Sequence, residues 1–69
     1  MKMEKELFYE HLRELRDHFG EEKVLLNMTE IEKYCHLDRR TLLSDRSFPA
    51  KKIGNRFMVP VVSFARWLS

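Results

Sequence analysis

The sequence predicts a small α+β fold with helices on either side of one β-hairpin. A chain of 69 residues, 43% of them hydrophobic, has the size of one domain and is too apolar for a disordered chain. Apolar residues recur at helical spacing in the first twenty positions. The dipeptide Gly54-Asn55 separates two short runs of strand-forming and basic residues, as the turn of a hairpin does.

The first expected element is a helix over residues 2–19. Its apolar stripe, spaced four, three and four positions apart, consists of Phe8, Leu12, Leu15 and Phe19. Gly20 is a natural residue to end this helix. The stripe has two interpretations: it docks on the rest of the chain, or it forms a dimer interface together with Met1, Met3 and Leu7. We favour docking, because an apolar interface of about two helical turns is too short for a stable coiled coil.

A second helix is expected over residues 28–35, after a short apolar connector at 24–26 for which extended backbone is one option. Asn27 is the expected N-cap, and Glu30, three positions later, completes a capping box. The inner face of this helix is expected to consist of Ile31, Tyr34 and Cys35.

A tight turn at residues 36–37 leads to a third helix over about residues 39–45, with Asp38 as its N-cap. Pro49 cannot continue a helix and disfavours helical geometry in the residue before it, so the third helix has about two turns. Its buried side is expected to be Leu42 and Leu43.

Two strands are expected at residues 50–53 and 56–59, because a Gly-Asn pair between them favours a tight turn with positive φ. The inward side chains are expected to be Ile53, Phe57 and Val59. Pro60 suits the first position of a last helix over residues 60–68. This helix is apolar nearly all round, so it is either well buried or in contact with a partner.

Charge is divided unevenly along the chain. Residues 1–23 carry five Lys and Arg against seven Asp and Glu, a net −2, whereas residues 24–69 carry eight against four, a net +4. The overall charge of +2 is therefore the sum of a basic segment and an acidic N-terminal helix. A basic segment of this kind favours a polyanionic partner.

Arg39 and Arg40 fall at the first two positions of the third helix, where a cation opposes the positive end of the helix dipole. Folding alone favours Asp or Glu there, so the pair indicates a function. In a helix-turn-helix, the start of the second helix meets base edges and phosphates, to which Arg, Thr41 and Ser44 can donate hydrogen bonds. A solvated arginine pair without a function is the alternative interpretation.

Lys51, Lys52, Asn55 and Arg56 surround the expected hairpin turn. A hairpin with a small, basic tip has the form of a wing that reaches the DNA backbone or the minor groove. The alternative is that the lysines protect the edge of the sheet from aggregation.

A family resemblance covers residues 26–68, about three-fifths of the chain. The segments that carry it are LNMTEI at 26–31, DRRTL at 38–42, FPAKKIGNRFMVP at 48–60 and FARWL at 64–68. Their order and spacing resemble the excisionase-type helix-turn-helix family, which is related to the MerR-like winged helix domains.

The resemblance implies a small winged helix-turn-helix with a two-stranded wing in residues 24–69, preceded by an extra amphipathic helix in residues 1–23. It implies DNA binding, as an excisionase (a recombination directionality factor) or as a small transcriptional regulator of a phage or mobile element. It makes Trp67 a core anchor of the last helix. The implied DNA contacts are Arg39, Arg40, Thr41 and Ser44 on the recognition helix and Lys51, Lys52, Asn55 and Arg56 on the wing.

The chain departs from the family pattern in two places. The stretch between Thr41 and Phe48 is about three residues shorter than usual, which leaves fewer side chains to face a groove. The N-terminal helix lies outside the motif altogether.

Other functional classes lack support in the sequence. Cys35 and His36 are adjacent, and His11 and His18 are seven positions apart, so neither pair has the spacing of a structural zinc site. We expect neither an enzyme nor a cofactor, because no glycine-rich phosphate loop or catalytic arrangement is present. No apolar run approaches the length of a membrane span and no signal-peptide pattern occurs, so we expect a cytoplasmic protein without a membrane partner.

The expected function is non-enzymatic binding of double-stranded DNA, with no small-molecule substrate. A second copy of the chain, as a dimer or in a cooperative array, and an integrase are further candidate partners. The competing interpretation is a protein-interaction module on a winged-helix scaffold that has lost DNA binding. Such a module would use the acidic N-terminal helix and the face around Trp67.

Overall fold

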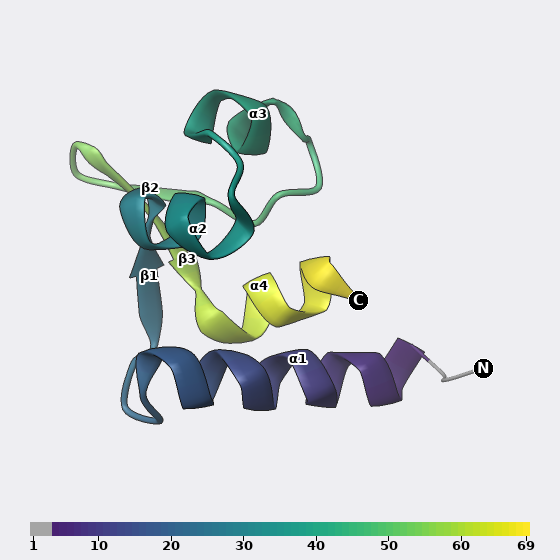
Figure 1. Cartoon of the computed structure of the whole chain (residues 1–69). Helices are drawn as coiled ribbons and strands as arrows, with labels where there is room; N and C mark the ends of the chain where they lie inside the picture. Colours follow the sequence, from purple (N-terminus) through teal and green to yellow (C-terminus); the bar gives the residue numbers. More distant parts are fainter. Residues whose placement is uncertain (1–3) are drawn as a thin grey trace.

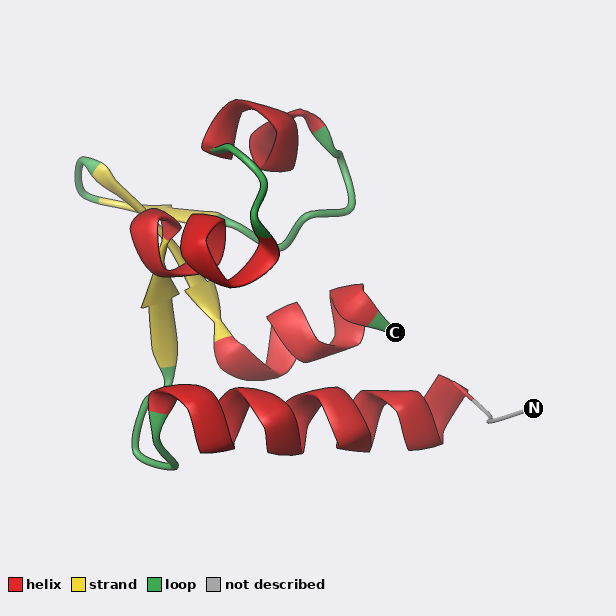
Figure 2. Cartoon of the chain, in the orientation of Figure 1, coloured by secondary structure: helices red, strands yellow, loops and turns green. Residues whose placement is uncertain are grey.

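The computed structural model describes residues 4–69, which form four helices and one three-stranded antiparallel sheet (Figures 1 and 2). The elements in chain order are α1 (Glu4–Phe19), β1 (Leu25–Asn27), α2 (Met28–Cys35), α3 (Arg39–Ser44), β2 (Lys51–Ile53), β3 (Arg56–Pro60) and α4 (Val61–Leu68). The predicted α+β class is confirmed. Positions 2 and 3 of the predicted first helix, and Met1 and Met3 of the alternative dimer interface, lie outside the described residues.

The sheet has the strand order β1-β3-β2, so β3 pairs with a neighbour on each side. β1 includes most of the segment that the sequence indicated as a connector, and residues 25–27 pair with residues 58–60. The predicted hairpin is therefore part of a larger sheet. A three-residue strand is too short to show an alternating pattern, so its pairing could not be predicted locally.

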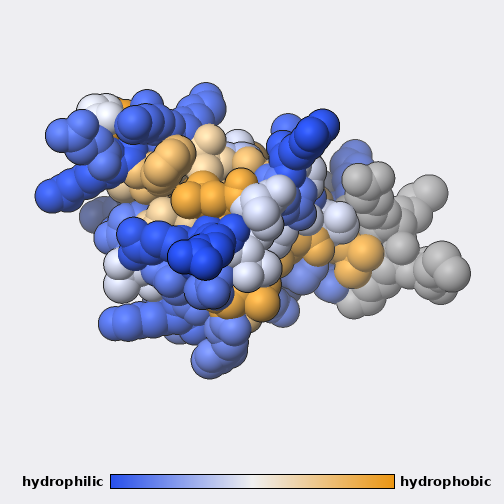
Figure 3. Space-filling model, turned by 90° about the horizontal axis from the view of Figure 1, so that it is seen from above, coloured by the Kyte–Doolittle hydropathy of each residue, from blue (hydrophilic) through white to orange (hydrophobic). Residues whose placement is uncertain are grey.

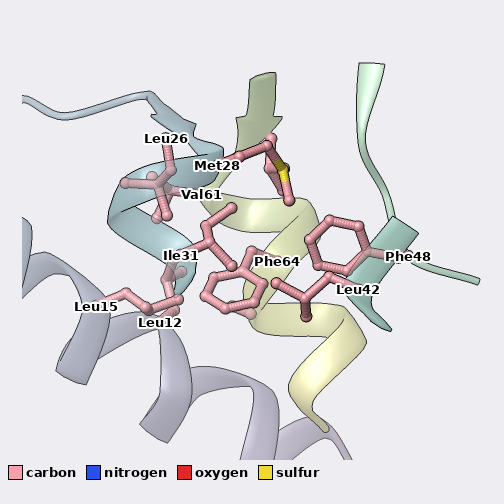
Figure 4. Packing of buried hydrophobic residues seen from close by; sticks show 11 residues of the cluster. Leu12, Leu15, Leu26, Met28, Ile31, Leu42, Phe48, Val61 and Phe64 are labelled. Atoms are coloured by element: carbon pink, nitrogen blue, oxygen red, sulfur yellow. The ribbon is translucent and has the colours of Figure 1, made fainter. Parts of the chain in front are cut away.

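One hydrophobic core joins the four helices to β1 and β3. α1 lies along α4 (Figure 1), and Leu12 and Leu15 of α1 are buried. Phe64 of α4 is completely buried, between these leucines and the pair Leu42 and Phe48 (Figure 4). The docking interpretation of α1 is thus confirmed. The buried hydrophobic residues are Leu12, Leu15, Leu26, Met28, Ile31, Leu42, Phe48, Val59, Val61, Phe64 and Ala65.

α2 begins where the sequence predicts, because Asn27 and Glu30 cap it reciprocally. The side-chain oxygen of Asn27 accepts a hydrogen bond from the backbone N–H of Glu30 at 2.8 Å. Oε1 of Glu30 accepts from the backbone N–H of Asn27 at 3.0 Å, which completes the capping box. The helix ends at Cys35, and its C-cap His36, with a left-handed φ of 58°, turns the chain toward α3.

α3 is shorter and less buried than predicted. Asp38 caps its start as expected, but the helix ends at Ser44, and Asp45 is its C-cap. Leu42 is 1% exposed whereas Leu43 is 37% exposed, so the prediction that both are buried is wrong for Leu43. A helix this short presents one narrow face to the core, and the residue after a buried one is rotated by about 100° away from it.

The loop after α3 is held against α4. The hydroxyl of Ser47 donates to Oδ1 of Asp45 at 2.7 Å and accepts from the indole N–H of Trp67 at 3.2 Å. The hydrogen bond from Ser47 lowers the pKa of Asp45. The Trp67 ring stacks on Phe64 and meets Phe48 edge to face, with centroids 5.9 and 5.0 Å apart. Trp67 therefore joins the loop to the core.

The β2–β3 hairpin extends beyond the core (Figure 1). Val59 at its base is fully buried, but Ile53 and Phe57 near its tip are 54% and 39% exposed, so the prediction that all three point inward is wrong. Opposed residues in an antiparallel pair share a face, and Arg56 lies opposite Ile53 while Lys52 lies opposite Phe57. Ile53 and Phe57 are consequently on opposite faces of the hairpin.

The predicted hairpin turn is confirmed, because Gly54 has a φ of 63° and Asn55 has no positive φ, as in a hairpin turn with glycine at the first central position. Two smaller differences concern the last helix. Pro60 is the N-cap of α4 and the last residue of β3, so the prediction that it opens the helix is one position too early. Val62 is 43% exposed, so α4 is not buried all round.

Candidate nucleic-acid interface

A cleft of about 300 Å³ lies between the start of α2, the start of α3 and the tip of the hairpin. These elements occupy the part of the molecule opposite α1 (Figure 1). The tertiary structure therefore brings together Arg39 from one predicted group of DNA contacts and Asn55 and Arg56 from the other. The lining residues are Asn27, Met28, Thr29, Arg39, Asn55, Arg56 and Phe57.

Arg39 is held by a carboxylate that sequence reasoning did not select. Oε1 of Glu32 accepts from Nη2 and Nε of Arg39 at 2.9 and 3.1 Å, and Oε2 accepts from the Arg39 backbone N–H at 3.1 Å. Thr29 Oγ1 lies 3.4 Å from the same Nη2. Arg39 thus has a structural role, because Glu32 offsets its unfavourable position at a helix N-terminus. The only sequence signal is an acidic residue seven positions earlier.

Arg40 differs from Arg39 in having no such partner. Its side chain is exposed, and within residues 4–69 it takes part in no hydrogen bond or ion pair. The nearest acidic residue in sequence, Asp38, is used as the N-cap and accepts from the backbone N–H of Thr41 at 2.7 Å. This hydrogen bond lowers the pKa of Asp38. The stability of the fold therefore gives no reason for the position of Arg40 at the start of α3.

Thr41 and Ser44 are exposed on α3, as candidate DNA contacts must be. The hydroxyl of Ser44 donates to the backbone carbonyl of Thr41 at 2.7 Å. Its proton is therefore already used inside the helix, and Ser44 would have to break this bond in order to donate to a phosphate. The Thr41 backbone N–H is occupied by the cap in the same way.

The four hairpin residues selected from the sequence are all exposed: Lys51, Lys52, Asn55 and Arg56. The register places Lys51 on the same face of the hairpin as Arg56. Lys52 lies on the other face, beside its cross-strand partner Phe57. Positive charge therefore lies on both faces of the hairpin. In the described part of the chain, none of the three cations forms an ion pair.

Figure 3 looks down on α3 and the hairpin and shows hydrophilic side chains around an apolar patch. One further exposed cation, Arg46, follows α3 and was not selected from the sequence. It lies in the loop between α3 and β2, where the carboxylate of Asp45 accepts from the backbone N–H of Ser47 at 2.8 Å.

Across residues 4–69, no group of three or more His, Cys, Asp and Glu side chains is arranged to hold a metal ion. The thiol of Cys35 is half-buried, and this burial raises its pKa. In the same described region, no helix has both the length and the apolar character needed to cross a membrane.

Comparison of the chain with protein-family models, with curated proteins and with solved structures gives no match.

Proposed function

We propose that this protein binds double-stranded DNA without enzymatic activity, as a winged helix-turn-helix of the excisionase-type, MerR-like kind. α2 and α3 would form the helix-turn-helix, and the β2–β3 hairpin would form the wing. The proposed role is that of a cytoplasmic recombination directionality factor or small transcriptional regulator of a phage or mobile element. A second copy of the chain and an integrase are proposed as further partners.

The observation that carries this proposal is the meeting of α3 and the hairpin tip at one cleft, with unpaired cations on both elements. Arg40 is the second residue of α3, and Lys51, Lys52 and Arg56 lie on the hairpin, none of them paired with a described acidic residue. Cations held apart from carboxylates keep their charge for phosphate oxygens.

Electrostatics also separates the two ends of the molecule. α1 lies on the side away from the hairpin (Figure 2), and its exposed residues include Glu6, Glu14 and Asp17. A duplex would be repelled by α1 and attracted by the hairpin and α3, which favours one docking orientation. We assign recognition-helix contacts to Arg39, Arg40, Thr41 and Ser44, and wing contacts to Lys51, Lys52, Asn55 and Arg56.

The competing function, a protein-interaction module, has less support. It requires a free face around Trp67, but the indole N–H of this residue is bonded to Ser47 and its ring packs on Phe48 and Phe64. The side chain that would anchor a partner is already used inside the molecule.

The test is a titration of labelled duplex DNA across a series of salt concentrations. The wing variant replaces Lys51, Lys52 and Arg56 with Ala. The control replaces Lys5, Arg13 and Arg16, three exposed cations of α1, with Ala and so removes the same charge. Affinity of the unmodified protein should fall steeply with salt. The slope of log K against log salt should decrease by ~0.9 for each phosphate that the wing variant no longer neutralises and stay unchanged in the control.

An equal slope in both triple variants would remove the wing from the interface. Absence of salt-dependent duplex binding by the unmodified protein would overturn the proposed function itself. Salt-insensitive binding to a protein partner would favour the interaction module instead.

A further inference from the structure

Glu32 and Arg39 form the most extensive polar contact in the described part of the chain outside the helix caps. One carboxylate receives three hydrogen bonds from a single residue, two from the guanidinium and one from the backbone N–H. The contact spans from the middle of α2 to the first residue of α3. It therefore fixes both the relative position of the two helices and the direction of the Arg39 side chain.

The geometry leaves one edge of the guanidinium free of any carboxylate. An arginine head carries five N–H groups in a planar fork. Glu32 takes the Nε–Nη2 side, so both N–H groups of Nη1 remain for another acceptor. The second N–H of Nη2 donates only to the Thr29 hydroxyl, at 3.4 Å, a long hydrogen bond that a better-placed acceptor in the cleft can replace. The side chain is 56% exposed and lines the cleft between α3 and the hairpin. A second planar acceptor can thus approach from the cleft.

Charge indicates what kind of acceptor suits this edge. The Glu32–Arg39 pair has no net charge, so it adds little to the electrostatic attraction of phosphates. The pair instead contributes directional hydrogen bonding, because a guanidinium held by a carboxylate presents two parallel N–H groups in a fixed plane. The O6 and N7 atoms of guanine are the acceptors that match this geometry.

We infer that Glu32 is a positioning residue, which holds Arg39 so that its free edge reads a guanine in the cleft. This inference rests on the proposed DNA-binding function. Arg40, which has no carboxylate partner, supplies charge, whereas Arg39 supplies selectivity. The two adjacent arginines therefore perform different tasks.

The test uses a duplex selected by the unmodified protein from a randomised pool, and a second duplex with the same bases in scrambled order. Selectivity is the ratio of the two affinities. Glu32→Gln removes a negative charge from the interface, so affinity for the scrambled duplex should rise. It also weakens the clamp, so selectivity should fall about tenfold, the value of one misaligned bidentate contact. Glu22→Gln, an equal charge change in the loop after α1, is the control and should leave selectivity unchanged.

Two further variants separate positioning from charge and from folding. Glu32→Asp keeps the charge but shortens the side chain, so selectivity should fall without a gain in affinity for the scrambled duplex. In an Arg39→Ala background, Glu32→Gln should have no further effect on selectivity. The melting temperature of every variant is measured first. All binding assays are then carried out below the lowest of these temperatures, where each variant is folded.

The inference is overturned if Glu32→Gln tightens binding to both duplexes by the same factor, since Glu32 would then only neutralise Arg39. It is also overturned if the unmodified protein binds duplex DNA without selectivity. That result would leave the proposed function intact, whereas a protein that binds no duplex would lose both.

Discussion

Leu26 of β1 lies directly opposite Val59 of β3, and both side chains are completely buried. The pair attaches the base of the hairpin to the strand that leads into α2. β3 therefore has two parts: its end near α4 belongs to the core, and its start near the turn is free for contact with a partner. The hairpin can project because β1 anchors the strand behind it.

Truncation of Leu26 should be far more damaging than truncation of its neighbour. Leu26→Ala removes a fully buried side chain, and such changes cost about 2 to 5 kcal/mol of unfolding free energy. A domain of this size buries little surface, so this loss should bring it close to unfolding. Leu25→Ala is the matched control, because Leu25 on the same strand is 37% exposed. Chemical denaturation followed by circular dichroism measures both, and equal losses would contradict the observed strand orientation.

The buried face of α1 should affect stability and leave oligomeric state unchanged. Leu15 is completely buried among core residues of the same chain, so Leu15→Ala should lower the free energy of unfolding by about 2 to 5 kcal/mol. Tyr9→Ala, at a position that is 54% exposed on α1, should have a small effect. Sedimentation at several concentrations should give the same mass for all three proteins. A dimer that dissociates in the Leu15 variant would favour the dimer-interface interpretation.

Asp38 should make part of the stability depend on acid pH. The backbone N–H of Thr41 donates to its carboxylate and lowers the pKa of Asp38 in the folded state below its unfolded value of about 4. The stabilisation is therefore complete above that unfolded value and is lost as pH falls through the folded pKa. Asp38→Asn keeps an N-cap but cannot titrate, so its melting temperature should decrease less than that of the unmodified protein between about pH 6 and pH 2.

The control for this experiment is Asp17→Asn, an exposed position inside α1 that caps no helix. Its melting curve should keep the acid dependence of the unmodified protein. If Asp38→Asn and Asp17→Asn show the same profile, the cap contributes nothing to acid sensitivity.

Arg40 should affect stability and DNA binding in opposite directions. Removal of an unpaired cation from a helix N-terminus is expected to stabilise the fold by about 0.3 to 1 kcal/mol, so Arg40→Ala should melt slightly higher. The same change should weaken binding to every duplex, because one phosphate is left without its cation. Arg39→Ala should instead reduce stability, since Glu32 loses its partner. Arg40→Lys, which keeps the charge, should match the unmodified protein in both measurements.

Local signals in the sequence were sufficient to place most elements. The capping box of Asn27 and Glu30 predicted the start of α2, and the Asp38 cap predicted the start of α3. Gly54 marked the turn of the hairpin. Each of these signals acts through hydrogen bonds or backbone angles within a few residues, so the sequence contains all the information that they require.

Exposure was harder to predict than position. Alternation along a strand defines two faces but does not say whether another element covers either of them. Ile53 and Phe57 were expected inside because they are apolar, yet both are exposed on the part of the hairpin that extends past the core. Leu43 was misjudged for the same reason, since α3 presents only one side to its neighbours.

Residue types and short-range geometry were enough to establish the α+β class, the helix caps and the hairpin turn. Which residues meet was settled by long-range packing. It paired β1 with β3, laid α1 along α4, joined Arg39 to Glu32 and left Arg40 unpaired within residues 4–69. Such outcomes depend on contacts between residues distant in sequence, whose formation is governed by the packing of the whole chain around one core.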